Sequence, residues 1–230
     1  MSELKKKVCD ANCALPRHGL VKLTWGNVSG IDRESGIVII KPSGVSYDSL
    51  TPEDMVAINM DGRVLSANMK PSSDTPTHLR LYQAFPIIGG IVHTHATHCT
   101  AFAQAGLGIP VFGTTHADHF YGEIPCTRAL TDMETGGDYE RETGGVIVET
   151  FLANKLNPLT MPGILVSSHG MFAFGRSAAE ALHNAVAMEE IAAMAFFSLS
   201  LKPCLPPVSQ ALLDKHFKRK HGPDAYYGQT

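Results

Sequence analysis

Residues 89–95 read Gly89-Gly90-Ile91-Val92-His93-Thr94-His95, and this stretch decides both how the chain folds and what it can bind. Glycines and β-branched residues lead into the histidines, so we expect a strand. Side chains alternate across a strand, which places both imidazoles on one face with their Cα atoms about 6.5–7 Å apart. Two histidines at that spacing can hold one metal ion, although two strand histidines hydrogen-bonded in a polar cleft would give the same pattern.

Histidine is unusually frequent around this strand. The chain has 11 histidines, and five of them lie between His93 and His119. Metal ligation and proton transfer are the functions that use histidine in this way. A third candidate ligand, His169, precedes Gly170, where the backbone can approach closely. Three histidines from two strand ends would form an open site of the catalytic zinc type; an ordinary turn histidine at 169 is the alternative.

Strand and helix patterns alternate on both sides of residues 89–95. The expected strands are 36–41, 55–60, 63–67, 164–168 and 172–174, and the expected helices are 4–15, 75–85, 98–104, 178–201 and 209–217. Ser177 and Glu180 predict a capping box, whereas residues 113–125 are typical of a loop. No repeat or long linker divides the chain, so we expect one α/β domain over residues 1–230.

The composition excludes several classes of protein. Hydrophobic residues make up 44% and charged residues 18%, which is typical of a globular domain rather than a disordered chain. A net charge of −3 argues against nucleic-acid binding. The apolar run at 191–197 is shorter than the roughly 20 residues of a membrane span, and residues 2–7 do not lead into a signal-peptide core. Five cysteines without a Cys-x-x-Cys pair fit a reducing compartment, so we expect a cytoplasmic protein without a membrane partner.

Three turn-rich segments offer groups that bind phosphate. They are Gly26-Asn27, Lys41-Pro42-Ser43-Gly44 and Ser72-Ser73. Each supplies small side chains, hydroxyls or backbone N–H groups at a turn or helix start. Hydrogen bonds to a charged group contribute about 1.5–3 kcal/mol each, so three or four would anchor a phosphate. The alternative is that they are plain turn and cap residues.

The order of these motifs resembles the 4-epimerase branch of the class II aldolase/epimerase family. The matching segments are 24–29, 41–45, 71–75, 89–95, 113–118 and 215–229, so that the resemblance covers the chain from Leu4 to Gln229. It implies a single α/β domain with a central, mostly antiparallel sheet flanked by helices. It also implies a homotetramer with active sites between subunits.

The resemblance assigns roles to individual residues. It implies a metal site at His93, His95, His169 and Asp74, where Asp74 favours an epimerase because the related aldolases have glutamate there. It implies that Asp118 and Tyr227 are the acid/base pair, although a loop aspartate such as Asp118 is often only a turn former. It implies substrate contacts at Gly26, Asn27, Ser43, Gly44, Ser72 and Ser73. His216 matches an active-site histidine of undefined role.

The activity implied is the metal-dependent C4 epimerisation of L-ribulose 5-phosphate to D-xylulose 5-phosphate by retro-aldol cleavage and re-addition. The cofactor implied is one Zn²⁺ per subunit, or another divalent metal. A class II sugar-phosphate aldolase is the alternative, followed by a metallohydrolase, because residues 93–98 approach a His-x-His-x-Asp-His motif but carry Thr97. A non-catalytic binding domain on the same fold is a further alternative. The chain departs from the family at His119, Met171 and Phe174, none of which is a ligand; His119 could alter the pKa of its neighbour Asp118 or the substrate preference.

Overall fold

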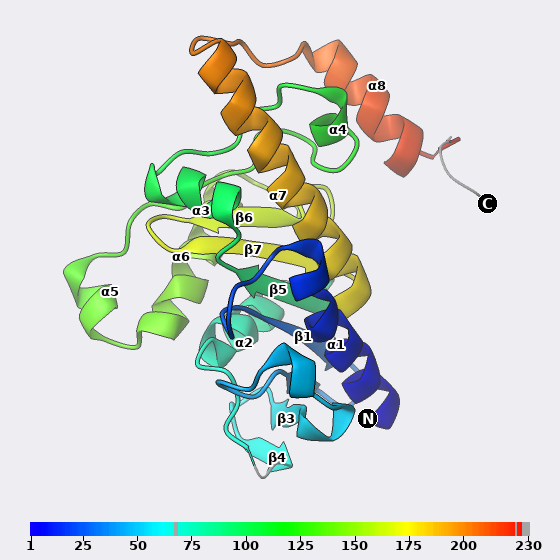
Figure 1. The fold of residues 1–230 in the computed structure, drawn as a ribbon, viewed down its shortest axis with the longest axis vertical. Coiled ribbons are helices and arrows are strands. Elements are labelled where there is room, and N and C mark those ends of the chain that lie inside the picture. The colour runs from blue at the N-terminus through cyan, green and yellow to red at the C-terminus, as the bar shows by residue number, and fades with distance from the viewer. Residues whose placement is uncertain (67–68, 224, 227–230) are drawn as a thin grey trace.

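The computed structural model describes residues 1–66, 69–223 and 225–226 and has a seven-stranded sheet at its centre (Figure 1). The strands follow the order β4-β3-β2-β1-β5-β7-β6, and every neighbouring pair is antiparallel. Their bounds are β1 Asn27–Asp32, β2 Ile37–Ile40, β3 Val56–Asn59, β4 Val64–Ser66, β5 Gly90–Thr94, β6 Gly163–Val166 and β7 Gly170–Gly175. The expected α/β architecture with a mostly antiparallel sheet is confirmed.

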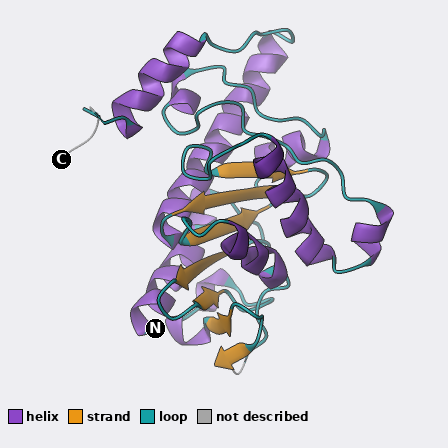
Figure 2. Ribbon diagram, turned by 180° about the vertical axis from the view of Figure 1, so that it is seen from behind, coloured by secondary structure: helices purple, strands orange, loops and turns teal. Residues whose placement is uncertain are grey.

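Helices cover both faces of the sheet, as Figures 1 and 2 show. Their bounds are α1 Ser2–Ala14, α2 Thr75–Ala84, α3 Thr97–Gln104, α4 Thr114–Ala117, α5 Asp132–Gly136, α6 Tyr139–Ala153, α7 Ala178–Leu201 and α8 Gln210–His221. Helices α1 and α7 pack on one face, whereas α2 and α6 pack together on the other. Helices α4 and α8 contact each other beyond the sheet, near the C-terminal half of α7.

The alternation of side chains along β1 explains this layering. Gly30 faces α1 so closely that an added Cβ atom would lie 2.9 Å from a methyl group of Val8. Ser29 points to the opposite face, where its hydroxyl oxygen lies 2.7 Å from His78 Nδ1 and 2.8 Å from the Tyr82 hydroxyl, both on α2. The face that carries α2 therefore has buried polar groups as well as a core.

Helix α7 is a core helix. Its 24 residues are apolar enough, by length and composition, to cross a membrane. Ala181, Ala185 and Met188 are nevertheless fully buried, and the helix packs along β5 and β7. The apolar character of α7 is thus explained by its packing against the sheet.

Several local predictions were incomplete or wrong. Residues 113–125 include the turn of helix α4, and α8 continues past 217 to His221. Ser177 accepts a hydrogen bond from the Glu180 N–H as expected, but the Glu180 carboxylate accepts from the Arg176 N–H instead of closing the capping box. The sequence patterns also missed β1, α5 and α6.

Candidate active site and metal centre

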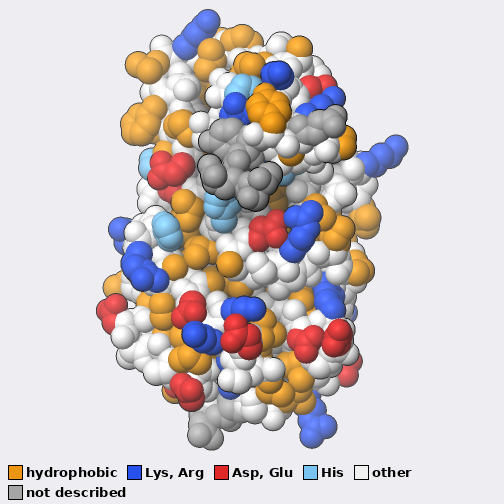
Figure 3. All heavy atoms as spheres, turned by 90° about the vertical axis from the view of Figure 1, so that its right-hand side faces the viewer, with side chains coloured by type: hydrophobic (Ala, Val, Ile, Leu, Met, Phe, Trp, Pro, Cys, Tyr) orange, Lys and Arg blue, Asp and Glu red, His pale blue; other side chains and the backbone are white. Residues whose placement is uncertain are grey.

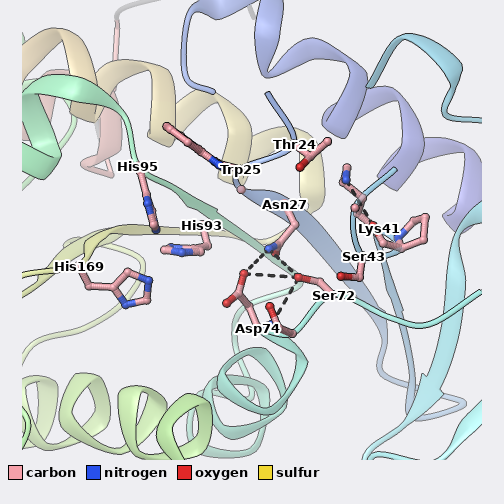
Figure 4. A pocket seen from close by; sticks show the side chains of 14 residues that line it. Thr24, Trp25, Asn27, Lys41, Ser43, Ser72, Asp74, His93, His95 and His169 are labelled. Atoms are coloured by element: carbon pink, nitrogen blue, oxygen red, sulfur yellow. Dashed lines mark hydrogen bonds between the residues drawn. The ribbon is translucent and has the colours of Figure 1, made fainter. Parts of the chain in front are cut away.

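The residues predicted to bind the metal and the substrate gather in one cavity of about 530 Å³, which we call the histidine pocket (Figure 4). It opens where β1 and β5 meet the turn before β7 and the start of α2. Its lining consists of Thr24, Trp25, Gly26, Asn27, Lys41, Pro42, Ser43, Gly44, Ser72, Ser73, Asp74, His93, His95 and His169. Every residue predicted to bind metal or phosphate lies in this lining, although the segments that carry them are far apart in sequence.

Three imidazoles converge within the histidine pocket. His93 ends up in β5, His95 follows that strand, and His169 lies in the turn between β6 and β7. One candidate ligand atom from each lies within 4.8 Å of the others. Gly170 makes this approach possible, because an added Cβ atom would lie 2.8 Å from the Thr94 carbonyl oxygen and 2.9 Å from the His95 ring.

The contacts behind two of the rings set their orientation. His93 Nδ1 donates to the carbonyl of Met171 at 2.9 Å, and its ring stacks on Phe172 with centroids 4.2 Å apart. The Tyr139 hydroxyl lies 3.4 Å from His169 Nδ1. Partners of this kind fix the ring and leave the other nitrogen for a metal.

The protonation state of the histidines also suits a metal. Burial, followed by the neighbouring His93 and His95, lowers the pKa of His169 to about 3. Burial, followed by His93, lowers the pKa of His95 as well. Metals bind neutral imidazole, so these rings are ready ligands near pH 7. The three histidines are consistent with a divalent metal ion.

Asp74 lies in the histidine pocket but outside the converging triad. Its carboxylate accepts a 2.6 Å hydrogen bond from Asn27 Nδ2 and a longer one, 3.4 Å, from the Ser72 hydroxyl. Burial alone would raise the pKa of Asp74, but His93, His78 and the Asn27 amide outweigh it and lower the pKa. Asp74 is therefore an ionised group beside the triad, and metal ligation by it stays a prediction.

The opposite end of the pocket has the chemistry of an anion site. Gly44 adopts a left-handed backbone with φ +71°, and Gly26 has φ +90°. An added Cβ atom at Gly26 would lie 2.8 Å from the His93 carbonyl oxygen. Lys41, which was not among the predicted site residues, also lines the pocket and is 2% exposed. Its ammonium group donates to the Pro42 carbonyl at 3.3 Å and lies 4.8 Å from the centre of the Tyr47 ring. The sequence feature that could have identified Lys41 as a site residue is its position at the end of a buried β-branched strand.

Asp118, one of the two predicted acid/base residues, does not line the histidine pocket of its own chain. Asp118 follows α4 and forms ion pairs with α8, and it is absent from the pocket lining. Tyr227 lies outside the described residues. His216, whose role the resemblance left open, places Nδ1 3.0 Å from an oxygen of Asp118.

The remaining histidine of the 93–98 motif does not extend the metal site. His98 Nδ1 lies 2.9 Å from the Glu189 carboxylate on α7. The structure thus offers no support for the metallohydrolase alternative. Of the three departures, Met171 supplies the carbonyl behind His93, Phe174 packs in the core against Phe85, and His119 faces His183.

Comparison with known proteins identifies the family. The family described as Class II Aldolase and Adducin N-terminal domain matches residues 6–196. Proteins named L-ribulose-5-phosphate 4-epimerase UlaF from Salmonella paratyphi B and Salmonella choleraesuis are each 58% identical over 229 residues, which covers 100% of both chains.

Solved structures share the fold at low sequence identity. An L-fuculose 1-phosphate aldolase superposes with a TM-score of 0.77 at 20% identity, covering 95% of this chain and 96% of its own. YgbL from Escherichia coli, described as a putative aldolase/epimerase/decarboxylase, gives 0.74 at 22% identity, covering 93% and 97%. With a family match over most of its length and full-length relatives at 58% identity, the chain belongs to the class II aldolase family.

Proposed function

We propose that the protein epimerises L-ribulose 5-phosphate at C4 to give D-xylulose 5-phosphate. The observation that carries this proposal is the histidine pocket, where three converging imidazoles share one cavity with turns suited to a phosphate. The full-length similarity to proteins named as 4-epimerases selects the substrate from the sugar phosphates that such a pocket could hold.

The donor set favours one divalent cation per subunit. His93, His95 and His169 would hold it, with Asp74 beside them. We propose zinc, since three neutral imidazoles suit it, while manganese or cobalt could bind the same donors. A cation bound there supplies Lewis-acid stabilisation of the negative charge that develops on the three-carbon fragment when the C3–C4 bond breaks.

The turns of the histidine pocket would bind and orient the substrate. Ser43, Gly44, Ser72 and Ser73, which line the pocket, would face the phosphate on C5, and the positive charge of Lys41, another lining residue, would favour it. Asn27 is already fixed by Asp74, and its side-chain oxygen is buried without a hydrogen-bond partner among the described residues. These contacts would hold the two-carbon fragment by its phosphate while its aldehyde turns.

Asp118 and Tyr227 would move the protons. One removes the proton from the C4 hydroxyl, and the C3–C4 bond breaks to give glycolaldehyde phosphate and the enediolate of dihydroxyacetone. The aldehyde rotates, and C3 forms the bond again on its opposite face. The other residue gives a proton to the new C4 alkoxide, so that configuration at C4 is inverted.

A second copy of the chain would complete the site. Asp118 does not line the histidine pocket of its own chain, so the two halves can meet only across an interface or through a large rearrangement. We propose a homotetramer with sites between subunits, which acts in the cytoplasm.

The test is a coupled assay for D-xylulose 5-phosphate formed from L-ribulose 5-phosphate. We expect turnover by the purified protein, its loss after chelation, and its return with Zn²⁺, Mn²⁺ or Co²⁺. Accumulation of free glycolaldehyde phosphate without epimerisation would instead indicate an aldolase. Turnover that survives complete metal removal would refute the mechanism.

A further inference from the structure

The Asp118 carboxylate is surrounded by basic side chains from one helix, α8. Arg219 Nε lies 3.0 Å from Oδ1 and Nη2 lies 2.6 Å from Oδ2. His216 Nδ1 lies 3.0 Å from Oδ1, and Lys220 Nζ lies 3.7 Å from Oδ2. We call these four residues the Asp118 cluster. Its basic members all come from the second half of α8, so they tie this helix to the end of α4, beside the apolar contact of Ala117 with Leu213.

Arg219 differs from the other partners because it contacts both carboxylate oxygens. A planar guanidinium that donates to both oxygens fixes the plane of a carboxylate as well as its position. His216 reaches one oxygen, and Lys220 approaches only at ion-pair distance. Rotation of the Asp118 side chain would break the two bonds to Arg219 together.

We propose that Arg219 is a positioning residue, which clamps the Asp118 carboxylate in the orientation needed for proton transfer. This inference rests on the proposed function, in which Asp118 exchanges a proton at the C4 oxygen. Asp118 is only 7% exposed, so little of its surface is left for the substrate, and the direction in which that surface points matters. Misplacement of a reacting group by about 1 Å can cost about 10²-fold in rate.

The charges around Asp118 also favour the ionised form of its carboxyl group. Burial raises the pKa of the carboxyl, but the bonds from Arg219 and His216 and the charge of Lys220 outweigh it and lower the pKa. Asp118 therefore stays ionised near neutral pH and can accept a proton.

Other titratable groups close to the cluster are histidines. His221 Nε2 donates to the Asp118 main-chain carbonyl at 2.9 Å, and His119 faces His183 of α7 with ring centroids 5.4 Å apart. His116 belongs to the same short helix α4. His119, His183, Lys220 and His221 also line a cavity of about 560 Å³. Figure 3 shows that histidine, basic and acidic side chains are all present on one face of the molecule.

The experiment compares Arg219→Gln and Arg219→Lys with Lys218→Gln in the metal-loaded, full-length protein. Lys218 is a suitable control because it lies in the same helical turn but pairs with Asp214 rather than with Asp118. We expect Arg219→Gln to lower kcat by about 10–100-fold, the scale of a misplaced group, with KM and metal content close to wild type. Arg219→Lys should keep the pH profile but recover only part of kcat, because one ammonium group cannot bind both oxygens.

The pH dependence separates positioning from a merely structural role. In Arg219→Gln, the acidic limb of the kcat profile should move to higher pH, because the carboxyl loses its strongest partner. Titration of the ¹³C-labelled Asp118 carboxyl, assigned through Asp118→Asn, should show the same upward shift of its pKa, with no shift in Lys218→Gln.

Two results would overturn the proposal. One is an unchanged Asp118 titration in Arg219→Gln, and the other is a loss of activity that comes with loss of metal or unfolding in both Arg219 variants. The carboxyl titration needs no turnover. A wild-type protein that does not epimerise the sugar phosphate would therefore defeat the proposed function, while the titration would still decide whether the clamp exists.

Discussion

The histidine pocket and the Asp118 cluster hold predicted site residues by different means. In the pocket, the backbone ladder does the positioning, since Asn27 pairs with His93 across β1 and β5, and Thr94 pairs with Met171 across β5 and β7. In the cluster, side chains of α8 pair with the Asp118 carboxylate, beside the apolar contact of Ala117 with Leu213. Strand register positions residues in the pocket, whereas charged and hydrogen-bonding side chains position the Asp118 carboxylate.

In the proposed function, this difference would combine a rigid metal centre with an adjustable proton-transfer group. Strand register cannot shift by one residue without turning every side chain to the other face, so the triad is strongly fixed. An ion pair weakens when its carboxylate takes up a proton. Substitutions in the two halves should therefore have separable effects on metal content and on proton transfer.

The largest expected effect is that of His95→Asn. Loss of one of three imidazoles removes a cation that contributes several kcal/mol to charge stabilisation, so activity should fall by more than about 10³-fold. Bound metal, measured by mass spectrometry of the purified protein, should fall with it. His98→Asn is the matched control, because His98 binds Glu189 outside the pocket. Undiminished metal stoichiometry in His95→Asn would remove this residue from the ligand set.

Asp118→Asn should be nearly as damaging but should leave the metal in place. Loss of an acid/base group typically costs about 10²–10⁴-fold in rate. The carboxylate lies outside the pocket lining, so metal content should match the wild type. The coupled assay and the same metal analysis test both halves of this prediction. Parallel loss of metal would mean that Asp118 supports the metal centre, and the separation between the two halves would fail.

Gly170→Ala should cause a moderate loss confined to the metal half. The new methyl group would lie 2.8 Å from the Thr94 carbonyl oxygen and 2.9 Å from the His95 ring, so the triad has to move. We expect a metal affinity lower by about 10–100-fold, as for disturbed contacts behind a ligand. Gly136→Ala is the control, since its methyl group would meet nothing within 4 Å. Equal affinities in a competition with a fluorescent chelator would show that the triad tolerates the displacement.

The smallest expected effect is on the free energy of unfolding, and it appears only at acidic pH. Burial lowers the pKa of His78, on the pocket side, to about 3 and that of His116, on the cluster side, to about 4. Histidine in the unfolded state titrates near 6.5. Below that pH the unfolded state therefore binds more protons than the folded state. The free energy of unfolding of the metal-free protein should therefore fall as the pH drops from 6.5 to 4 and stay level above 6.5.

Urea titrations at several pH values would measure this slope in the wild type, in His78→Gln and in His116→Gln. Each variant should show a shallower dependence than the wild type. A slope that neither substitution changes would assign the acid sensitivity to other groups.

The sequence was informative where function and local structure required the same residues. The alternation of His93 and His95 indicated both a strand and a metal site, and the strands expected at 55–60 and 63–67 correspond to the paired β3 and β4. The triad needed only His169 from another segment. Its position after a strand and before Gly170 was enough to suggest it.

Strand β1 was missed because its functional residues hide the strand pattern. Asn27 and Ser29 are buried polar residues in a central strand, where Asn27 contacts Asp74 and Ser29 contacts His78 and Tyr82. Hydrophobic alternation cannot reveal such a strand, because its buried polar side chains are stabilised by hydrogen bonds to residues that are distant in sequence.

Helix α6 and the arginine clamp were missed for reasons of tertiary packing. Gly144 disfavours a helix, yet an added Cβ atom there would lie 2.8 Å from Arg80 Cβ on α2, so close packing requires glycine. Arg219 meets Asp118 across 101 residues of chain. No local pattern in a basic helix end identifies which carboxylate it will bind.

The central claim is that the histidine pocket of one subunit works with the Asp118 cluster of another. Co-expression of His95→Asn and Asp118→Asn chains with different affinity tags, followed by purification on both tags, isolates hybrid oligomers. In a closed ring with random mixing, about a quarter of the sites would have both intact halves, so hybrids should recover about a quarter of wild-type epimerase activity although each parent is almost inactive. Hybrids no more active than their parents would contradict a site shared between subunits.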